Sequence, residues 1–438
     1  MKKGFILFCV GVLMMAGTLQ VQGKVIPKDW TTESGTTVWL ANRPSLPFVV
    51  MKVLVKAGSV YDTDEKAGEA YLLSQLLSEG AGGMTGLQIS QALDFMGSDL
   101  DIMCGKDYAA ITLVTLREHL EESFKILALV LTQPTLSKDD FDRVKREVVG
   151  ELLKEEEDPG LVASRAFDEA IFKGHPYHRP EKGYVKTVEA LTLKDVKGVY
   201  ERFYHPNFAI FSVAGDVTQD EIQGLMDKYL KGWLPSESPL PSVSDCPFLP
   251  EGGETILEKK VTQANIILGH LGVKRGDPDF VKVYVMNQIL GGGGLTSRLF
   301  QEIREDRGLS YSVYSSYQPT YWRGAFRVVL QTKNERAQEA IKEVKKVLIE
   351  YRSKGPSKEE LEDAKRYLTG SFPLKLDTNQ KIADYMAFAA FHGLGTHYFV
   401  EFPKAIQRVT LEEVREAARK YIHPERLFVL VVKAPSSP

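Results

Sequence analysis

Two stretches of this sequence repeat one another at a fixed separation of 218 residues. The matched pairs, with no gap between them, are Leu193/Leu411, Val196/Val414, His205/His423 and Pro206/Pro424. In each stretch Thr-Leu-x-x-Val predicts a helix start with Thr192 or Thr410 as N-cap. The pattern of an apolar strand follows each His-Pro pair. One offset shared by four pairs favours duplication over chance, so the chain is predicted to fold as two related halves.

The region 236–253 separates the two halves. It contains four prolines and no hydrophobic periodicity, which predicts a linker between domains 24–235 and 254–438. Strand patterns occur at 48–55, 209–213, 264–268 and 427–432, and amphipathic helical patterns at 118–131, 138–155, 335–351 and 357–369. These patterns mix without a regular β-α-β alternation. We therefore predict an α+β fold in which each half is a mostly antiparallel sheet packed with helices.

The segment 68–80 has two faces at helical spacing. Its apolar stripe consists of Leu72, Leu73, Leu76 and Leu77. Its polar stripe consists of Tyr71, Ser74, Gln75 and Ser78. Positions i, i+3, i+4 and i+7 share one side of a helix, so the segment is predicted to be an amphipathic helix.

The polar stripe resembles the zinc helix of the insulinase/pitrilysin-type (inverzincin) peptidases, in which H-x-x-E-H lies among similar small and aliphatic residues. The resemblance implies that Tyr71 and Gln75 stand at the positions of the two histidine ligands and Ser74 at that of the glutamate base. An amide and a protonated phenol are poor zinc ligands, and a hydroxyl cannot replace a carboxylate base. We therefore expect no metal and no cofactor on this chain.

The resemblance also implies a third zinc ligand, a glutamate about 76 residues beyond Gln75. Glu151 stands there, with Glu147 one turn before it. One remaining carboxylate does not make a zinc site. Taken without the resemblance, the two glutamates are better explained as the acidic face of an amphipathic helix. The inward face of that helix would consist of Phe141, Val144, Val148 and Leu152.

The second half carries a run of four glycines, Gly291, Gly292, Gly293 and Gly294, followed by Arg304 and Tyr311. A phosphate-binding loop is not favoured, because no Gly-Lys-Ser/Thr follows the glycines. The run resembles the loop in the C-terminal half of the same peptidases, which precedes a helix and an Arg-x6-Tyr pair. Without the resemblance, Arg304 would be one charge in a mixed cluster and Tyr311 a half-buried aromatic residue of a strand.

In that family, the tyrosine hydroxyl donates a hydrogen bond to the oxyanion formed on the scissile carbonyl, and the arginine holds the substrate backbone. Some members divide the work between two chains, of which one carries H-x-x-E-H and the other has lost it but keeps Arg and Tyr. The resemblance therefore implies a non-catalytic subunit of a heterodimeric zinc metallopeptidase. It would supply Arg304 and Tyr311 in trans to a partner that holds the zinc, and it would act on unfolded peptides.

Two alternatives remain open. A degenerate peptidase fold could serve as a scaffold or binding protein with no role in proteolysis. The chain could also be a peptidase with a different metal site, although its eight histidines form no H-x-x-E-H or H-x-x-x-H pair.

The N-terminal segment and the composition indicate where the protein acts and which partners it does not bind. Residues 1–23 have the pattern of a signal peptide, with two lysines, an apolar run from Phe5 to Ala16 and small residues before a cleavage point. We expect export to the periplasm without stable membrane insertion, a retained anchor being the alternative. Removal of the signal leaves 53 basic against 58 acidic residues, which gives no basic surface for nucleic acid. A disulfide between Cys104 and Cys246 stays open.

Overall fold

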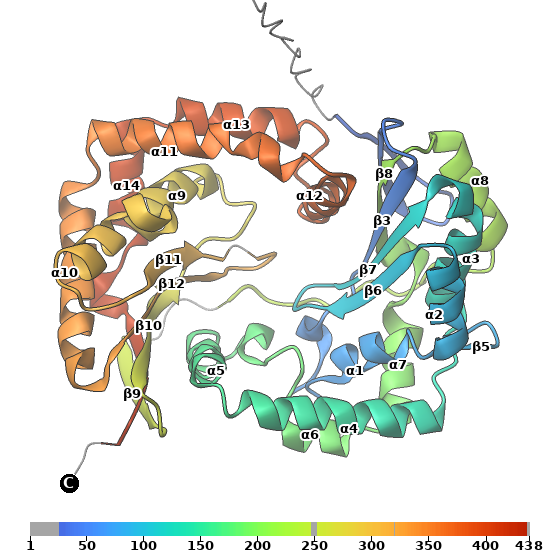
Figure 1. Cartoon of the computed structure of the whole chain (residues 1–438), viewed down its shortest axis with the longest axis horizontal. Coiled ribbons are helices and arrows are strands. Elements are labelled where there is room, and N and C mark those ends of the chain that lie inside the picture. The colour runs from blue at the N-terminus through green and yellow to red at the C-terminus, as the bar shows by residue number, and fades with distance from the viewer. Residues whose placement is uncertain (1–25, 247–251, 319, 436–438) are drawn as a thin grey trace, which may run out of the picture.

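The computed structural model describes residues 26–246, 252–318 and 320–435. The predicted signal peptide lies outside these residues. Figure 1 shows two sheets that face each other across the molecule, each with helices on its outer side. The predicted α+β fold with two related halves is confirmed.

The first sheet has the strand order β1-β2-β8-β3-β7-β6. Its strands are β1 (Lys28–Thr31), β2 (Thr37–Asn42), β3 (Phe48–Val55), β6 (Asp99–Cys104), β7 (Ala109–Leu116) and β8 (Ala209–Gly215). All neighbours are antiparallel except β2 and β8. A separate two-stranded ribbon joins β4 (Gly80–Ala81) to β5 (Met84–Thr85).

The second sheet has the order β11-β12-β10-β13-β9. Its strands are β9 (Gly253–Glu258), β10 (Gln263–Leu271), β11 (Val313–Tyr317), β12 (Ala325–Lys333) and β13 (Phe428–Lys433). Here β9 and β13 form the one parallel pair. Read from its parallel pair outward, this sheet repeats β2-β8-β3-β7-β6 strand for strand, as expected for a duplicated unit.

The helices of the first half are α1 (Glu69–Leu76), α2 (Gly86–Phe95), α3 (Leu120–Thr132), α4 (Lys138–Glu155), α5 (Pro159–Ile171), α6 (Val185–Ala190), α7 (Leu193–Phe203) and α8 (Gln219–Tyr229). Those of the second half are α9 (Phe280–Asn287), α10 (Ala337–Lys354), α11 (Lys358–Gly370), α12 (Asn379–Phe391), α13 (Tyr398–Arg408) and α14 (Leu411–Tyr421). The predicted caps are confirmed, because Thr192 and Thr410 each accept a hydrogen bond from the N3 backbone N–H of α7 and α14.

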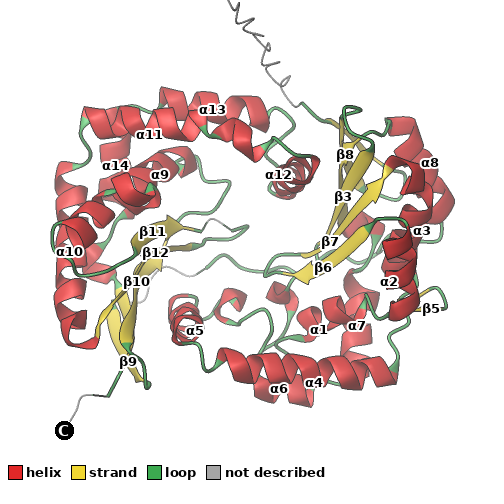
Figure 2. Ribbon diagram, in the orientation of Figure 1, coloured by secondary structure: helices red, strands yellow, loops and turns green. Residues whose placement is uncertain are grey.

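Strand β3 shows how each sheet is covered on both faces (Figure 2). Val49, Met51 and Val53 face the helices of their own half, including α3 and α7. Val50 and Leu54 point the opposite way and contact α12, a helix of the other half. Because successive side chains of a strand alternate between faces, one strand serves two cores.

The exchange of helices is reciprocal. Helix α5 of the first half packs on β10 and β13 of the second sheet, and α12 of the second half packs on β3 and β8 of the first. In Figure 1 both helices lie between the two sheets. The described chain between α8 and β9 contains no helix or strand. The boundaries 24–235, 236–253 and 254–438 stay predictions, and the exchange means that the two halves share their cores.

Two close contacts fix these exchanged helices. A Cβ on Gly269 of β10 would lie 2.7 Å from the ring of Phe167 of α5, so the absence of a side chain there admits the ring. On the other side, the buried Ser212 of β8 donates a hydrogen bond of 2.7 Å to the backbone carbonyl of Ala383 in α12. Both contacts join sheet and helix across the two halves.

Within the described residues no helix is long and apolar enough to cross a membrane. Cys104 and Cys246 are both buried and both free thiols. Cys104 packs in the core of the first half, whereas Cys246 packs in the cluster around α5.

Phe167→Ala should strongly destabilise the protein, because the side chain is fully buried where α5 meets the second sheet. We expect a loss of about 3–5 kcal/mol, measured as the fall in free energy of unfolding by denaturant titration. Leu161→Ala on the same helix is the control, since Leu161 is 49% exposed. Equal effects of the two substitutions would contradict the proposed importance of the exchanged helix.

Candidate functional site

Helix α1 begins at a tight turn fixed by a buried carboxylate. Gly68, its N-cap, has φ of 100°, a left-handed conformation that favours glycine. The Asp62 carboxylate accepts hydrogen bonds from the backbone N–H groups of Gly68 (2.9 Å) and Ala70 (3.3 Å). Burial raises the pKa of Asp62 well above its usual value, although these two hydrogen bonds lower it. Helix α1, which carries Tyr71, Ser74 and Gln75 at the positions of the zinc motif, is therefore anchored at its start.

The predicted orientation of α1 is confirmed, with the leucine stripe fully buried. Tyr71 and Gln75 are half-buried and share one side of the helix, whereas Ser74 is fully buried. The Ser74 hydroxyl donates to the backbone carbonyl of Tyr71 at 2.7 Å. It therefore completes a contact within its own helix and cannot act as a base.

Helix α4 packs against α1 and presents its acidic face. Its buried residues are the four predicted for the inward side: Phe141, Val144, Val148 and Leu152. The side chains of Glu147 and Glu151 are 56% and 52% exposed. The interpretation of these two glutamates as an acidic helix face is thus confirmed, and both are held by cations.

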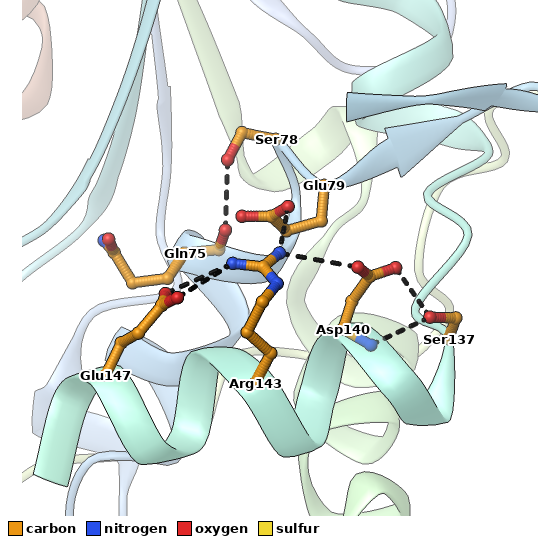
Figure 3. Close-up of polar contacts among 7 residues, drawn as sticks. All are labelled: Gln75, Ser78, Glu79, Ser137, Asp140, Arg143 and Glu147. Atoms are coloured by element: carbon orange, nitrogen blue, oxygen red, sulfur yellow. Dashed lines mark hydrogen bonds and ion pairs between the residues drawn. The ribbon is translucent and has the colours of Figure 1, made fainter. Parts of the chain in front are cut away.

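Arg143 joins the C-terminal end of α1 to α4 (Figure 3). Its guanidinium donates to Glu147 at 3.1 Å and to Asp140 at 3.4 Å on its own helix. It also pairs with Glu79, which lies just beyond the end of α1. Glu147 is therefore neutralised from within α4.

Lys182 performs the corresponding role at the other end of α1. Its ammonium donates to Glu151 at 2.8 Å and to Glu155 at 2.7 Å, and it lies 5.5 Å from the centre of the Tyr71 ring. Burial alone would lower the pKa of Lys182, but the hydrogen bonds to Glu151 and Glu155 outweigh it and raise that pKa. The amine is therefore charged throughout the physiological range.

These residues do not fit a zinc ion. The donor set comprises a phenol, an amide and one carboxylate, and that carboxylate is already bound by Lys182. Burial raises the pKa of Tyr71, so its phenolate is disfavoured as well. Among the described residues, no group of three His, Cys, Asp or Glu side chains is placed to hold a metal.

In the second half, Tyr311 is the exposed residue of the expected pair. Its side chain is 82% exposed, and it precedes β11, which begins at Val313. The alternative of a half-buried strand residue is therefore wrong, because the turn at Gly308 (φ 56°) places Tyr311 before the strand rather than in it. The Arg304 guanidinium stacks on Tyr311 with its carbon 4.8 Å from the ring centre. The two predicted residues thus lie together at the surface.

The glycine run extends the C-terminal end of α9 as irregular helical turns. A Cβ on Gly291 would lie 2.5 Å from the backbone nitrogen of Ser315, and one on Gly293 would lie 2.6 Å from the carbonyl oxygen of Gln288. These glycines therefore allow the backbone to approach β11 and its own preceding turn closely. These close approaches, together with the positive φ of Gly294 (61°), explain the run without a phosphate.

Sequence reasoning missed Lys182 and Arg143. Lys182 is more than 100 positions beyond Gln75, in the turn before α6, and it belongs to no motif. A search for cations near the acidic face of the predicted helix 138–155 would have found Arg143, four positions before Glu147. Nothing in the sequence alone brings Lys182 to Glu151.

The two halves match two profiles of one family. Residues 37–183 match the insulinase peptidases (peptidase family M16), and residues 190–368 match the peptidase M16 inactive domain. The chain belongs to peptidase family M16. The resemblance inferred from the degenerate zinc helix and the Arg/Tyr pair is therefore confirmed.

Similar proteins carry names of both active and inactive types. A Bacillus subtilis protein named as an uncharacterized zinc protease, YmxG, is 25% identical over 94% of this chain and 99% of its own length. A Helicobacter pylori protein named as a non-peptidase homolog, YmxG, is 25% identical over 99% and 98%. A Pseudomonas fluorescens structure described as a peptidase M16 inactive domain has a TM-score of 0.89 at 29% identity, covering 94% and 98%. Because the side chains at its zinc-motif positions do not fit zinc, this chain is an M16-fold protein of the inactive type.

The purified chain alone should bind no stoichiometric zinc and cleave no unfolded peptide, because neither the ligands nor the base are present at Tyr71, Ser74 and Gln75. Metal analysis after dialysis and a fluorescent-peptide assay with and without chelator measure both properties. About one tightly held zinc per chain, with chelator-sensitive cleavage, would contradict the assignment.

Glu69→Gln should stabilise the protein at high pH only. Burial raises the pKa of Glu69 from 4.5 to about 7; attraction by Lys66 and Arg202 opposes the rise, and repulsion by Asp195 adds to it. Because the folded-state pKa is the higher one, wild-type stability falls as pH rises from about 4.5 to about 7 and stays low above that. The gain for Glu69→Gln should reach up to about 3 kcal/mol at pH 8 and vanish near pH 4. Denaturant titration at both pH values tests this, and the exposed Glu65→Gln is the control.

Proposed function

We propose that this chain is the non-catalytic subunit of a heterodimeric zinc peptidase, to which it supplies Arg304 and Tyr311 in trans. The observation that carries the proposal is the exposure of Tyr311, at 82%, with a guanidinium stacked against its ring. A large aromatic side chain is normally covered at least in part, and residues of this kind are enriched where proteins bind partners. At this exposure the hydroxyl can reach a group outside this chain.

The chemistry of the pair supports a role beside a partner's zinc. A neutral phenol hydroxyl can donate to a developing oxyanion, and one such donor is worth about 10²–10³ in rate. A guanidinium with its five N–H donors can hold peptide carbonyls. Neither group activates water, so the pair is useful for peptide hydrolysis only where another chain provides the metal and the base.

The second sheet offers a route for an extended peptide. Strand β11 is one of its two edge strands, and Tyr311 lies two residues before β11 begins. An extended peptide that paired with the open edge of β11 would run past Tyr311. This arrangement favours unfolded peptides over folded proteins as substrates.

The N-terminal pattern supports a proposal for the cellular location of the complex. We propose that residues 1–23 direct export and that the heterodimer works in the periplasm, with a catalytic M16 chain carrying H-x-x-E-H as the partner. Such a chain encoded beside this one would be the first candidate for co-expression.

Tyr311→Phe should leave assembly with the catalytic partner intact but lower the kcat of the complex by about 10²-fold or more, because only the oxyanion donor is removed. Arg304→Ala should raise KM as well, since a guanidinium also holds the substrate before reaction. Co-purified complexes assayed on a flexible peptide of a few tens of residues measure both effects.

Tyr367→Phe is the matched control, because Tyr367 lies on α11 rather than on the proposed peptide route and is 62% exposed. Its kcat should equal that of the unaltered complex. Unchanged turnover in the Tyr311 and Arg304 variants would remove the role in trans and favour a scaffold without a part in proteolysis.

A further inference from the structure

Lys182 lies in the turn before α6, and the position of this turn against α1 is fixed by backbone contacts. A Cβ on Gly68, the N-cap of α1, would lie 2.5 Å from the carbonyl oxygen of Lys182. A Cβ on Gly183 would lie 2.0 Å from the carbonyl oxygen of Ala67. The backbones of the two turns are therefore in direct contact, and only glycine at these two positions permits it.

Polar side chains hold the same two turns together. Arg179 donates to Asp64 at 2.5 Å and to the backbone carbonyl of Asp62 at 2.7 Å. Thr187 of α6 donates to the carbonyl of Ala67 at 2.7 Å. The main chain at Lys182 is thus fixed next to the start of α1, and its side chain needs little further ordering to reach α4.

We propose that the Lys182 ammonium takes over, between α1 and α4, the position and the stabilising role that a bound metal cation has in a zinc-binding relative. The cation contacts Glu151, the remaining ligand position on α4, and the face of Tyr71, the first ligand position on α1. The negative face of an aromatic ring attracts a cation, so tyrosine serves an ammonium where histidine would serve zinc.

The second carboxylate distinguishes this arrangement from a chance surface ion pair. Glu151 and Glu155 are one turn apart on α4, where like charges repel. Lys182 bridges both, and its side chain is only 28% exposed. Its loss would leave two neighbouring carboxylates uncompensated, and its presence repels a divalent cation from the same position.

The first test measures stability and needs neither partner nor substrate. Lys182→Met keeps the length of the side chain and should lower the Tm by a few degrees at low salt. Adding Glu151→Gln and Glu155→Gln should restore most of the loss, because no uncompensated charge then remains. Lys154→Met is the control, an exposed lysine on α4 that should change the Tm little. A Lys182→Met effect no larger than that of Lys154→Met, or no recovery with the glutamine pair, would overturn the proposal.

The second test measures metal binding by competition with a fluorescent zinc chelator. Tyr71→His, Ser74→Glu and Gln75→His together should gain little zinc affinity while Lys182 is present. Adding Lys182→Ala should strengthen zinc binding at least about tenfold, because it frees Glu151 and removes a positive charge. Equal affinity with and without Lys182 would show that the ammonium does not hold the position of the metal. Both tests are independent of the heterodimer, so failure of the proposed function would not affect them.

Discussion

The structure depends on the reciprocal exchange of α5 and α12 between its two sheets. Each sheet has one face covered by its own helices and the other by a helix from the opposite half, so neither half buries its sheet alone. Because this packing is made of fully buried side chains such as Phe167 and Met386, it fixes the relation of the halves. The positions of α1 in one half and of Tyr311 in the other follow from that relation.

Duplication followed by divergence explains how the site residues are distributed. Helices α1 and α9 occupy corresponding places in the two repeats, each following the strand at the centre of its sheet. The first repeat keeps the frame of a zinc helix without its ligands, whereas the second follows α9 with the glycine run and the Arg304–Tyr311 pair. The functional side chains of each repeat can thus change while the packed core that supports them stays the same.

The sequence predicts the helices and strands better than it predicts the tertiary contacts between them. Strand 48–55 and helix 138–155 are observed with the predicted bounds, because their apolar patterns are clear and the N-cap Ser137 fixes the start of the helix. The exchange of α5 and α12 was not predicted, since an apolar helix face does not specify which sheet covers it. Lys182 was missed for a similar reason: its contact with Glu151 is set by turns at Gly68 and Gly183 that lie far apart in the sequence.

The two sites differ in how their polar groups are satisfied, and this difference agrees with the proposed function. Around α1 the carboxylates of α4 are matched inside the chain, Glu147 by Arg143 and Glu151 by Lys182, so no metal is needed for charge balance. Tyr311 contributes little to its own core at 82% exposure, and removing its hydroxyl leaves no buried group unpaired. A residue with so little structural role is available for the proposed contact between its hydroxyl and a group outside the chain. Internal neutralisation at α1 and exposure at Tyr311 are therefore what the proposed subunit requires, because it would need no metal of its own and a hydroxyl open to its partner.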